Sequence, residues 1–216
     1  MALSVAPRIY VLAGVNGAGK SSISGAAIRA FGGEYFNPDE VARQLRVVNP
    51  KLTQTEANSA AWQQGRRLLE RAIAERLDFA FETTLGANTI PRLLAEAAAR
   101  GIQIHLWYAG LSSPELHIAR VHARVHKGGH DIPEADIRRR YQHSRLNLIQ
   151  LLPQLTELRM FDNSVEADPS MGKAPILKLV LHMARKKIVG PADLSKTPQW
   201  AKPIVAAAMR LSSKST

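Results

Sequence analysis

Eight residues near the amino terminus have the types and spacing of a phosphate-binding loop. Residues 14–21 read Gly-Val-Asn-Gly-Ala-Gly-Lys-Ser and satisfy the pattern G-x-x-x-x-G-K-[ST]. Glycines let backbone N–H groups turn toward phosphate oxygens, and the amino end of a following helix attracts negative charge. In such a loop the lysine reaches the β- and γ-phosphates and the serine hydroxyl coordinates Mg²⁺. The alternative is an ordinary glycine-rich turn, but the motif favours nucleotide binding by Gly14, Asn16, Gly17, Ala18, Gly19, Lys20, Ser21 and Ser22, with Ser21 as the metal ligand.

A carboxylate follows the second apolar segment. The run Phe36-Asn37-Pro38-Asp39-Glu40 places Asp39 just past the carboxyl end of an expected strand, where open α/β sheets bind ligands. An acid in that position can take the proton of an acceptor hydroxyl as a general base. It can also serve as the N-cap of a helix over residues 41–45, a role that aspartate often fills. The residue types alone leave both roles open.

A second carboxylate ends the next apolar segment. Phe79-Ala80-Phe81 runs into Glu82, Thr83 and Thr84, which are expected at the same edge of the sheet. A carboxylate at the end of an apolar strand is costly to bury unless a cation or ligand pairs with it. Glu82 is therefore expected to orient an acceptor, to hold Mg²⁺ through water, or both, and a purely structural ion pair is the alternative.

Basic residues surround a glycine pair further along the chain. Arg120, Arg124 and Lys127 precede Gly128-Gly129, and the run 138–140 is Arg-Arg-Arg. Arginine suits phosphate because its planar guanidinium donates hydrogen bonds in pairs and stays protonated. The pattern predicts a lid over about residues 120–140, with Arg124 and Arg139 as the best candidates for phosphate contact. A solvated basic face is the alternative.

Positioning these side chains at one edge requires alternating strands and helices. Five short apolar segments are expected to be strands: 9–13, 34–37, 79–82, 102–109 and 158–161. The stretches between them have helical character: 21–30, 55–76, 90–100, 114–125 and 133–152. The pattern predicts an α/β fold of the P-loop NTPase type, with a five-stranded, mostly parallel sheet between helices.

Composition limits the class of protein. The chain has 216 residues, 45% of them apolar and 22% charged, which is typical of one globular domain with an appendage. We expect a kinase domain over residues 1–164 and a basic helical extension over 165–216, with helices at 174–187 and 203–211. The chain has no cysteine and no apolar run near the roughly 20 residues of a membrane span, so a cytoplasmic protein is expected.

The charge balance is strongly basic. The chain carries 29 Lys and Arg against 18 Asp and Glu, a formal net charge of +11. A phosphorylated small molecule, a nucleic acid and an acidic protein would all be attracted by it. The charge alone does not choose among these partners.

In this order, the motifs resemble the zeta toxin family of small P-loop kinases. The likeness covers about residues 8–164 and rests on the loop 14–21, Asn37–Glu40, Phe81–Thr84, the stretch 120–140 and Asp162-Asn163-Ser164. The best-known members phosphorylate a hydroxyl of UDP-N-acetylglucosamine with ATP and are held inactive by an antitoxin. They carry a Gly-Asp pair where this chain has Pro38-Asp39.

The resemblance implies a role for each matching residue. Lys20 would stabilise phosphate, Asp39 would be the catalytic base, and Arg124 and Arg139 would be the lid arginines. Asn37, Glu82 and Thr83 would contact the substrate, and Asn163 would lie near the adenine. ATP and Mg²⁺ would be the cofactors.

Three functions are compatible with these features. The leading one is an ATP- and Mg²⁺-dependent kinase acting on a small molecule, for instance UDP-N-acetylglucosamine or another nucleotide sugar, with an antitoxin protein as a further partner. The second is a polynucleotide or RNA-linked P-loop kinase, which the net charge of +11 and the basic residues after 164 motivate, although a nucleic-acid partner is not the favoured one. The third is an interaction module that senses ATP without turning it over.

Overall fold

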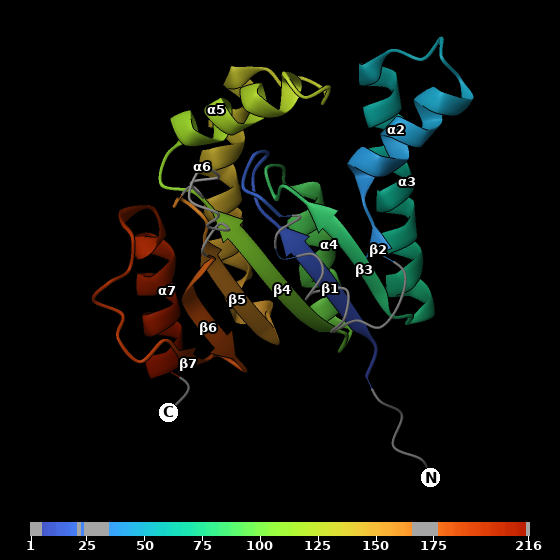
Figure 1. The fold of residues 1–216 in the computed structure, drawn as a ribbon. Helices are drawn as coiled ribbons and strands as arrows, with labels where there is room; N and C mark the ends of the chain where they lie inside the picture. Colours follow the sequence, from blue (N-terminus) through green and yellow to red (C-terminus); the bar gives the residue numbers. More distant parts are fainter. Residues whose placement is uncertain (1–5, 21–22, 24–34, 166–176, 215–216) are drawn as a thin grey trace.

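The computed structural model describes residues 6–20, 23, 35–165 and 177–214 of the chain (Figure 1). Within these ranges a seven-stranded sheet runs through the molecule in the order β2-β3-β1-β4-β5-β6-β7. The first five strands are parallel and the last two are antiparallel. The strands are β1 (Arg8–Ala13), β2 (Tyr35–Phe36), β3 (Phe79–Thr83), β4 (Gln103–Gly110), β5 (Glu157–Asp162), β6 (Lys178–Ala184) and β7 (Lys187–Gly190).

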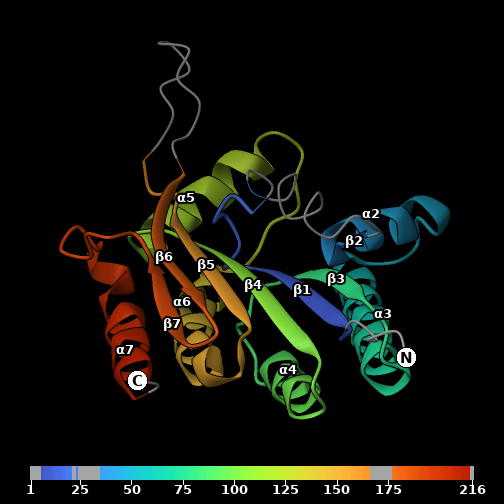
Figure 2. The ribbon, with the colours of Figure 1, turned by 90° about the horizontal axis from the view of Figure 1, so that it is seen from below.

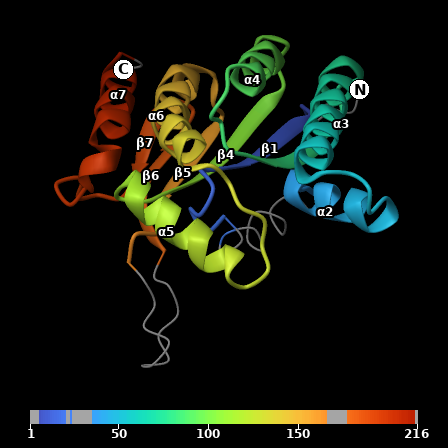
Figure 3. The same cartoon turned by 90° about the horizontal axis from the view of Figure 1, so that it is seen from above.

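Helices lie on both sides of this sheet. They are α2 (Pro38–Val48), α3 (Gln54–Glu75), α4 (Thr89–Ala99), α5 (Pro114–Val125), α6 (Glu134–Leu151) and α7 (Lys202–Ser213), with 3-10 turns at Leu152–Gln154 and Gln199–Ala201. Figure 2 shows α3, α4, α6 and α7 side by side against one face. Seen from above in Figure 3, α2 and α5 lie on the opposite side. The largest apolar cluster lies between the sheet and the helices α3, α4, α6 and α7. It includes Ile9, Ile104, Leu106, Leu158 and Met160, which are all fully buried.

Local sequence signals begin several of these helices. Asn37 caps α2 by accepting from the N–H groups of Asp39 and Glu40. Thr53 and Glu56 form a reciprocal capping box at the start of α3. Ser113 caps α5 by accepting from the N–H of Leu116. Each cap satisfies donors that would otherwise lack partners in the first helical turn.

The strand register determines which residues share the upper edge of the sheet. β1 lies between β3 and β4, with Ala13 opposite Thr83 on one side and opposite Tyr108 on the other. Because these strands are parallel, the loop after Ala13 and the end of β3 leave the sheet together. The phosphate-binding loop and Glu82 are neighbours for this reason.

The predicted α/β class with a mostly parallel sheet is confirmed. The five expected strands and the helices expected over 55–76, 90–100, 114–125 and 133–152 are found with small differences at their ends. The helix expected over residues 21–30 lies outside the described residues, apart from the helical Ile23.

The carboxyl-terminal part differs from the expected helical extension. Residues 178–184 and 187–190 form a hairpin that adds two strands to the expected five, so the helix expected over 174–187 is wrong for every residue described there. Arg185 and Lys186 form the two-residue turn with φ of 48° and 65°, as a type I′ turn requires. Neither is the glycine or asparagine that usually marks such a turn. Val180, Leu181 and Met183 are buried against the rest of the sheet.

The last helix was predicted, and it closes the end of the sheet. The helix expected over 203–211 is α7, which packs against α6 and β7. Just before it, the buried indole of Trp200 donates to Asp162 Oδ1 at 3.1 Å and packs on Gly110, where a Cβ would lie 2.2 Å from the ring. The domain boundary between residues 164 and 165 stays a prediction. None of the described helices is both long and apolar enough to cross a bilayer.

Candidate active site

The loop after β1 has the backbone of a phosphate-binding turn. Gly17 and Gly19 have φ of +79° and +78°, a region that side chains other than glycine rarely occupy. At Gly17 a Cβ would also lie 2.7 Å from the carbonyl oxygen of His117. Lys20 is buried and its Nζ donates to the carbonyl of Gly14 at 2.7 Å. Ser21 and Ser22, expected to bind metal and phosphate, lie outside the described residues.

Glu82 joins this loop to the next two strands. Its Oε1 lies 3.3 Å from Lys20 Nζ, and both side chains are about nine-tenths buried. Its Oε2 accepts from the Tyr35 hydroxyl at 2.7 Å and from Asn37 Nδ2 at 3.3 Å. Burial and the Glu82 carboxylate raise the pKa of Tyr35, which keeps the phenol protonated and donating. The carboxylate is thus held by one cation and two neutral donors.

Asp39 is not the N-cap of its helix. Asn37 takes that role, and Asp39 stands in the first turn of α2, so the capping alternative weighed from the sequence is wrong. The side chain of Asp39 is half exposed, and its Oδ2 lies 4.0 Å from Arg124 Nη1. Asp39 is therefore free of a capping bond, and its carboxylate faces the arginine-bearing side of the molecule.

The segment with the glycine pair links α5 to α6. Gly128 has φ of +87°, and the N–H of Gly129 donates to the carbonyl of Arg124 at 3.0 Å. Arg124 Nη2 in turn donates to the carbonyl of His130 at 3.1 Å. Ile132 from this segment packs with Val15 of the phosphate-binding loop in one apolar cluster. Contacts therefore connect the predicted lid directly to the loop.

Of the three consecutive arginines, Arg140 reaches the phosphate-binding loop. Its Nη1 donates to Asn16 Oδ1 at 2.8 Å, and Gly86 packs against its stem. Arg139, the residue favoured from the sequence, is largely exposed and pairs with Asp136 at 2.8 Å. Arg138 pairs with Glu115 on the surface. Helical geometry separates the three side chains by about 100° each, which the sequence run conceals.

Two further side chains brace the loop from behind. His117 on α5 is 1% exposed, and its Nδ1 lies 2.8 Å from the carbonyl oxygen of Asn16, so this nitrogen is the donor. Burial lowers the pKa of His117 to about 4, and the nearby Lys20 and Arg120 act in the same direction. On the other side Asn163 Nδ2 donates to the carbonyl of Ala18 at 3.0 Å. Asn163 thus contacts the loop backbone, and its contact with adenine stays a prediction.

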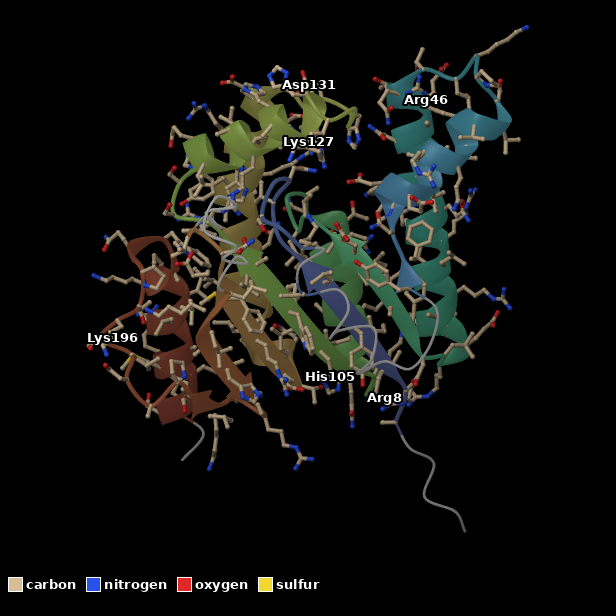
Figure 4. The ribbon with its side chains drawn as sticks, in the orientation of Figure 1. Arg8, Arg46, His105, Lys127, Asp131 and Lys196 are labelled. Carbon is tan, nitrogen blue, oxygen red and sulfur yellow. The ribbon has the colours of Figure 1, made fainter. Side chains whose placement is uncertain are left out.

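Part of this arrangement borders a cleft with a volume of about 790 Å³. Asp39 and Glu82 both line it, together with Thr83, Arg139 and Arg140. One wall comes from α3, and the other from α6 and the segment before it. In Figure 4, Lys127 and Asp131 mark the end of the α5 side, and Arg46 marks the facing α2–α3 arm. His105 and Arg8 lie at the opposite end of the sheet.

Sequence reasoning missed three contributors to this arrangement. The sequence predicts Tyr35 only as part of a strand and His117 only as part of a helix, and it favours Arg139 over Arg140. A histidine on the apolar face of an expected helix was the available signal for His117. No local signal showed that Tyr35 would meet a carboxylate 47 residues away.

The chain matches a family model and a curated relative. The family model for zeta toxin matches residues 3–167. An uncharacterized protein of Haemophilus influenzae is 33% identical over 132 residues, which are 59% of this chain and 88% of that protein.

Two solved structures share the fold. The AvrRxo1-ORF1:AvrRxo1-ORF2 complex with ATP matches with a TM-score of 0.66 and 15% identity, covering 91% of this chain and 65% of that one. The chain thus spans just under two thirds of the AvrRxo1 chain. The PezAT chromosomal toxin–antitoxin system of Streptococcus pneumoniae matches with a TM-score of 0.58 and 15% identity, covering 98% of this chain and 88% of that one. At these identities the two likenesses carry the fold alone.

Proposed function

The chain belongs to the zeta toxin family, and from this premise we propose that it transfers the γ-phosphate of ATP to a hydroxyl group of a small molecule. The family and its P-loop kinase fold support an ATP-dependent phosphotransferase. Two finer points are part of the proposal: which molecule accepts the phosphate, and which residues act on it. The proposed acceptor class is a nucleotide sugar such as UDP-N-acetylglucosamine.

One observation carries the proposal. Glu82 lies 3.3 Å from Lys20 and lines the same cleft as Asp39. A kinase needs phosphate-binding groups, a base near the acceptor hydroxyl and an opening in which the two substrates meet. A cleft lined by Asp39 and Glu82, with Lys20 paired to Glu82 at the same edge of the sheet, supports this scheme. The same residues on different faces of the molecule would have left only a glycine-rich turn.

The positions of these residues support a proposed role for each. ATP phosphates would bind the N–H groups of the loop 14–20 and Lys20, with Arg140 and Arg124 on the lid side. Asp39 would take the proton of the acceptor hydroxyl, since its carboxylate is half exposed in the cleft and makes no capping bond. Glu82, Asn37 and Thr83 would orient the acceptor. Magnesium, held by Ser21 and the phosphate oxygens, would neutralise charge that develops on the transferred group.

The test is transfer of label from γ-labelled ATP to nucleotide sugars in the presence of Mg²⁺. Replacing the base in Asp39→Asn should lower kcat by about 10²–10⁴-fold, and Lys20→Met should abolish transfer. Glu96→Gln removes an exposed carboxylate on α4 and should leave the rate unchanged. Unchanged turnover in Asp39→Asn would remove the base from the scheme. Tight ATP binding with no labelled product from any acceptor would refute the phosphotransferase itself.

A protein partner is also part of the proposal. The structural relatives include a toxin–antitoxin system and a two-component complex, which supports an antitoxin for this chain. Co-expression with the product of a neighbouring gene, followed by size-exclusion chromatography, tests it. A stable complex that lowers transfer of label is the expected result.

A further inference from the structure

One face of α3 lines the cleft and carries a single exposed aromatic ring. The cleft residues of this helix recur at helical spacing and are otherwise polar or glycine: Gln54, Thr55, Asn58, Ser59, Trp62, Gly65 and Arg66. Trp62 is 43% exposed, whereas Trp107 and Trp200 are 8% and 4% exposed. A large apolar ring left open inside a cleft is unlike the scattered apolar residues of an ordinary surface.

An arginine stands one turn after this ring. Arg66 Cζ lies 5.8 Å from the centre of the Trp62 ring, at the outer limit of a cation–π contact. Its Nη1 is 3.7 Å from Glu70 Oε1, a weak and partly exposed pair. Its Nε is buried and donates to no partner among the described residues. Arg66 thus keeps donors available beside an open aromatic face.

Close packing brings α3 against the strand that precedes the proposed base. Gly65 lies between Trp62 and Arg66 on the helix, and a Cβ there would come within 2.6 Å of the Phe36 ring. Glycine therefore lets α3 approach β2, the strand directly before Asn37 and Asp39. Phe36 and Phe81 also line the cleft, as do the carboxylates of Asp39 and Glu82. The helix is held at the side of the cleft that carries the proposed base.

We propose that Trp62 and Arg66 recognise the acceptor, as a platform on which a planar heteroaromatic ring stacks beside an anionic group. A nucleoside diphosphate moiety has both features, and its base can stack on indole whatever its hydrogen-bonding edge. Arginine contacts phosphate oxygens in pairs and stacks on aromatic rings at the same time. The inference rests on the proposed function, because it assigns the acceptor specificity of the same cleft to α3.

Binding is measured by calorimetry on the full chain saturated with a non-hydrolysable ATP analogue, so that the phosphate-binding loop is already filled. The probes are the diphosphates of uridine, cytidine and guanosine, ribose 5-phosphate as an anion without a ring, and uridine as a ring without an anion. Trp62→Ala should weaken the best diphosphate by about 5- to 150-fold, the range for base stacking. It should leave ribose 5-phosphate unchanged.

Two matched variants separate recognition from structure. Trp62→Phe keeps a ring and should retain most of the affinity. Arg66→Gln should weaken the diphosphate by about tenfold or more but leave uridine unchanged, because only the charged contact is lost. Arg71→Gln removes an arginine that pairs with Glu75 on the same helix but does not line the cleft, and it should have no effect.

The outcomes distinguish this inference from the proposed function. Equal diphosphate affinity in wild type and Trp62→Ala overturns the platform, and so does the absence of binding by all three diphosphates. Either result leaves the kinase proposal standing if wild type still transfers label from ATP. If wild type binds no ATP analogue or transfers no label, the kinase proposal is refuted instead. The affinities of the three diphosphates then test only the platform.

Discussion

The buried histidine behind the phosphate-binding loop makes stability depend on pH. His117 donates from Nδ1 to the carbonyl of Asn16, and burial lowers its pKa to about 4. The unfolded chain binds a proton at this residue near pH 6.5, whereas the folded chain excludes it. The folded state is therefore favoured above pH 6.5, and this advantage is lost as the pH falls toward 4. Over the pH range between the two pKa values, the stability that depends on His117 amounts to about 3 kcal/mol. Of this stability, about 2 kcal/mol is lost between pH 7.5 and pH 5.

Urea denaturation of wild type and His117→Gln at pH 7.5 and 5 tests this value. The other titrating groups are common to both proteins, so the difference between their pH dependences isolates the histidine. Wild type should lose about 2 kcal/mol more than the variant over this range. If His117→Gln does not fold, the imidazole C–H signals of wild type provide the test, since the His117 signal should not shift above pH 5. Equal pH dependences, or a shift near pH 6.5, would refute the reasoning.

Three further predictions follow from individual contacts. Gly17→Ala places a Cβ 2.7 Å from the His117 carbonyl at a φ of +79°, so it should weaken ATP binding and cost at least about 1–2 kcal/mol of stability by thermal denaturation. Arg140→Gln removes the bond to Asn16 and should lower ATP affinity by about tenfold or more in calorimetry, whereas the surface variant Arg138→Gln should change it by less than about twofold. Trp200→Phe removes the hydrogen bond to Asp162 and should lower the free energy of unfolding, measured in urea, by about 1–2 kcal/mol. An unchanged free energy of unfolding would mean that this bond does not stabilise the fold.

The parallel half of the fold follows from the sequence because its signals are local. Apolar runs predicted β1, β3, β4 and β5 and therefore the edge where their carboxyl ends meet. The hairpin was missed because its turn, Arg185-Lys186, has neither residue type that usually marks positive φ, and an apolar run before a basic cluster also fits a helix. In so short an apolar run, the hydrophobic periodicity does not distinguish a strand from a helix.

The candidate site, like the fold, is only partly predictable from local sequence patterns. The loop 14–20, Asp39 and Glu82 follow from motif and strand position, but the partners that hold them do not. Tyr35 and Glu82 are 47 residues apart, and His117 meets Asn16 across 101. Such contacts depend on strand order, and no local pattern encodes that order. The choice of Arg140 over its two neighbours likewise depends on how α6 is rotated against the sheet.

Strand order also explains how the lysine of the phosphate-binding loop and the proposed base are connected. Lys20 follows β1, Glu82 ends β3 and Asn37 follows β2, and these three strands are adjacent in the sheet. One carboxylate bridges them, since Glu82 contacts Lys20 with one oxygen and Asn37 with the other. Asn37 in turn caps the helix that carries Asp39. Two side chains, Glu82 and Asn37, thus connect the lysine of the phosphate-binding loop to the helix of the proposed base. We therefore expect Glu82→Gln to disturb the positions of both Lys20 and Asp39.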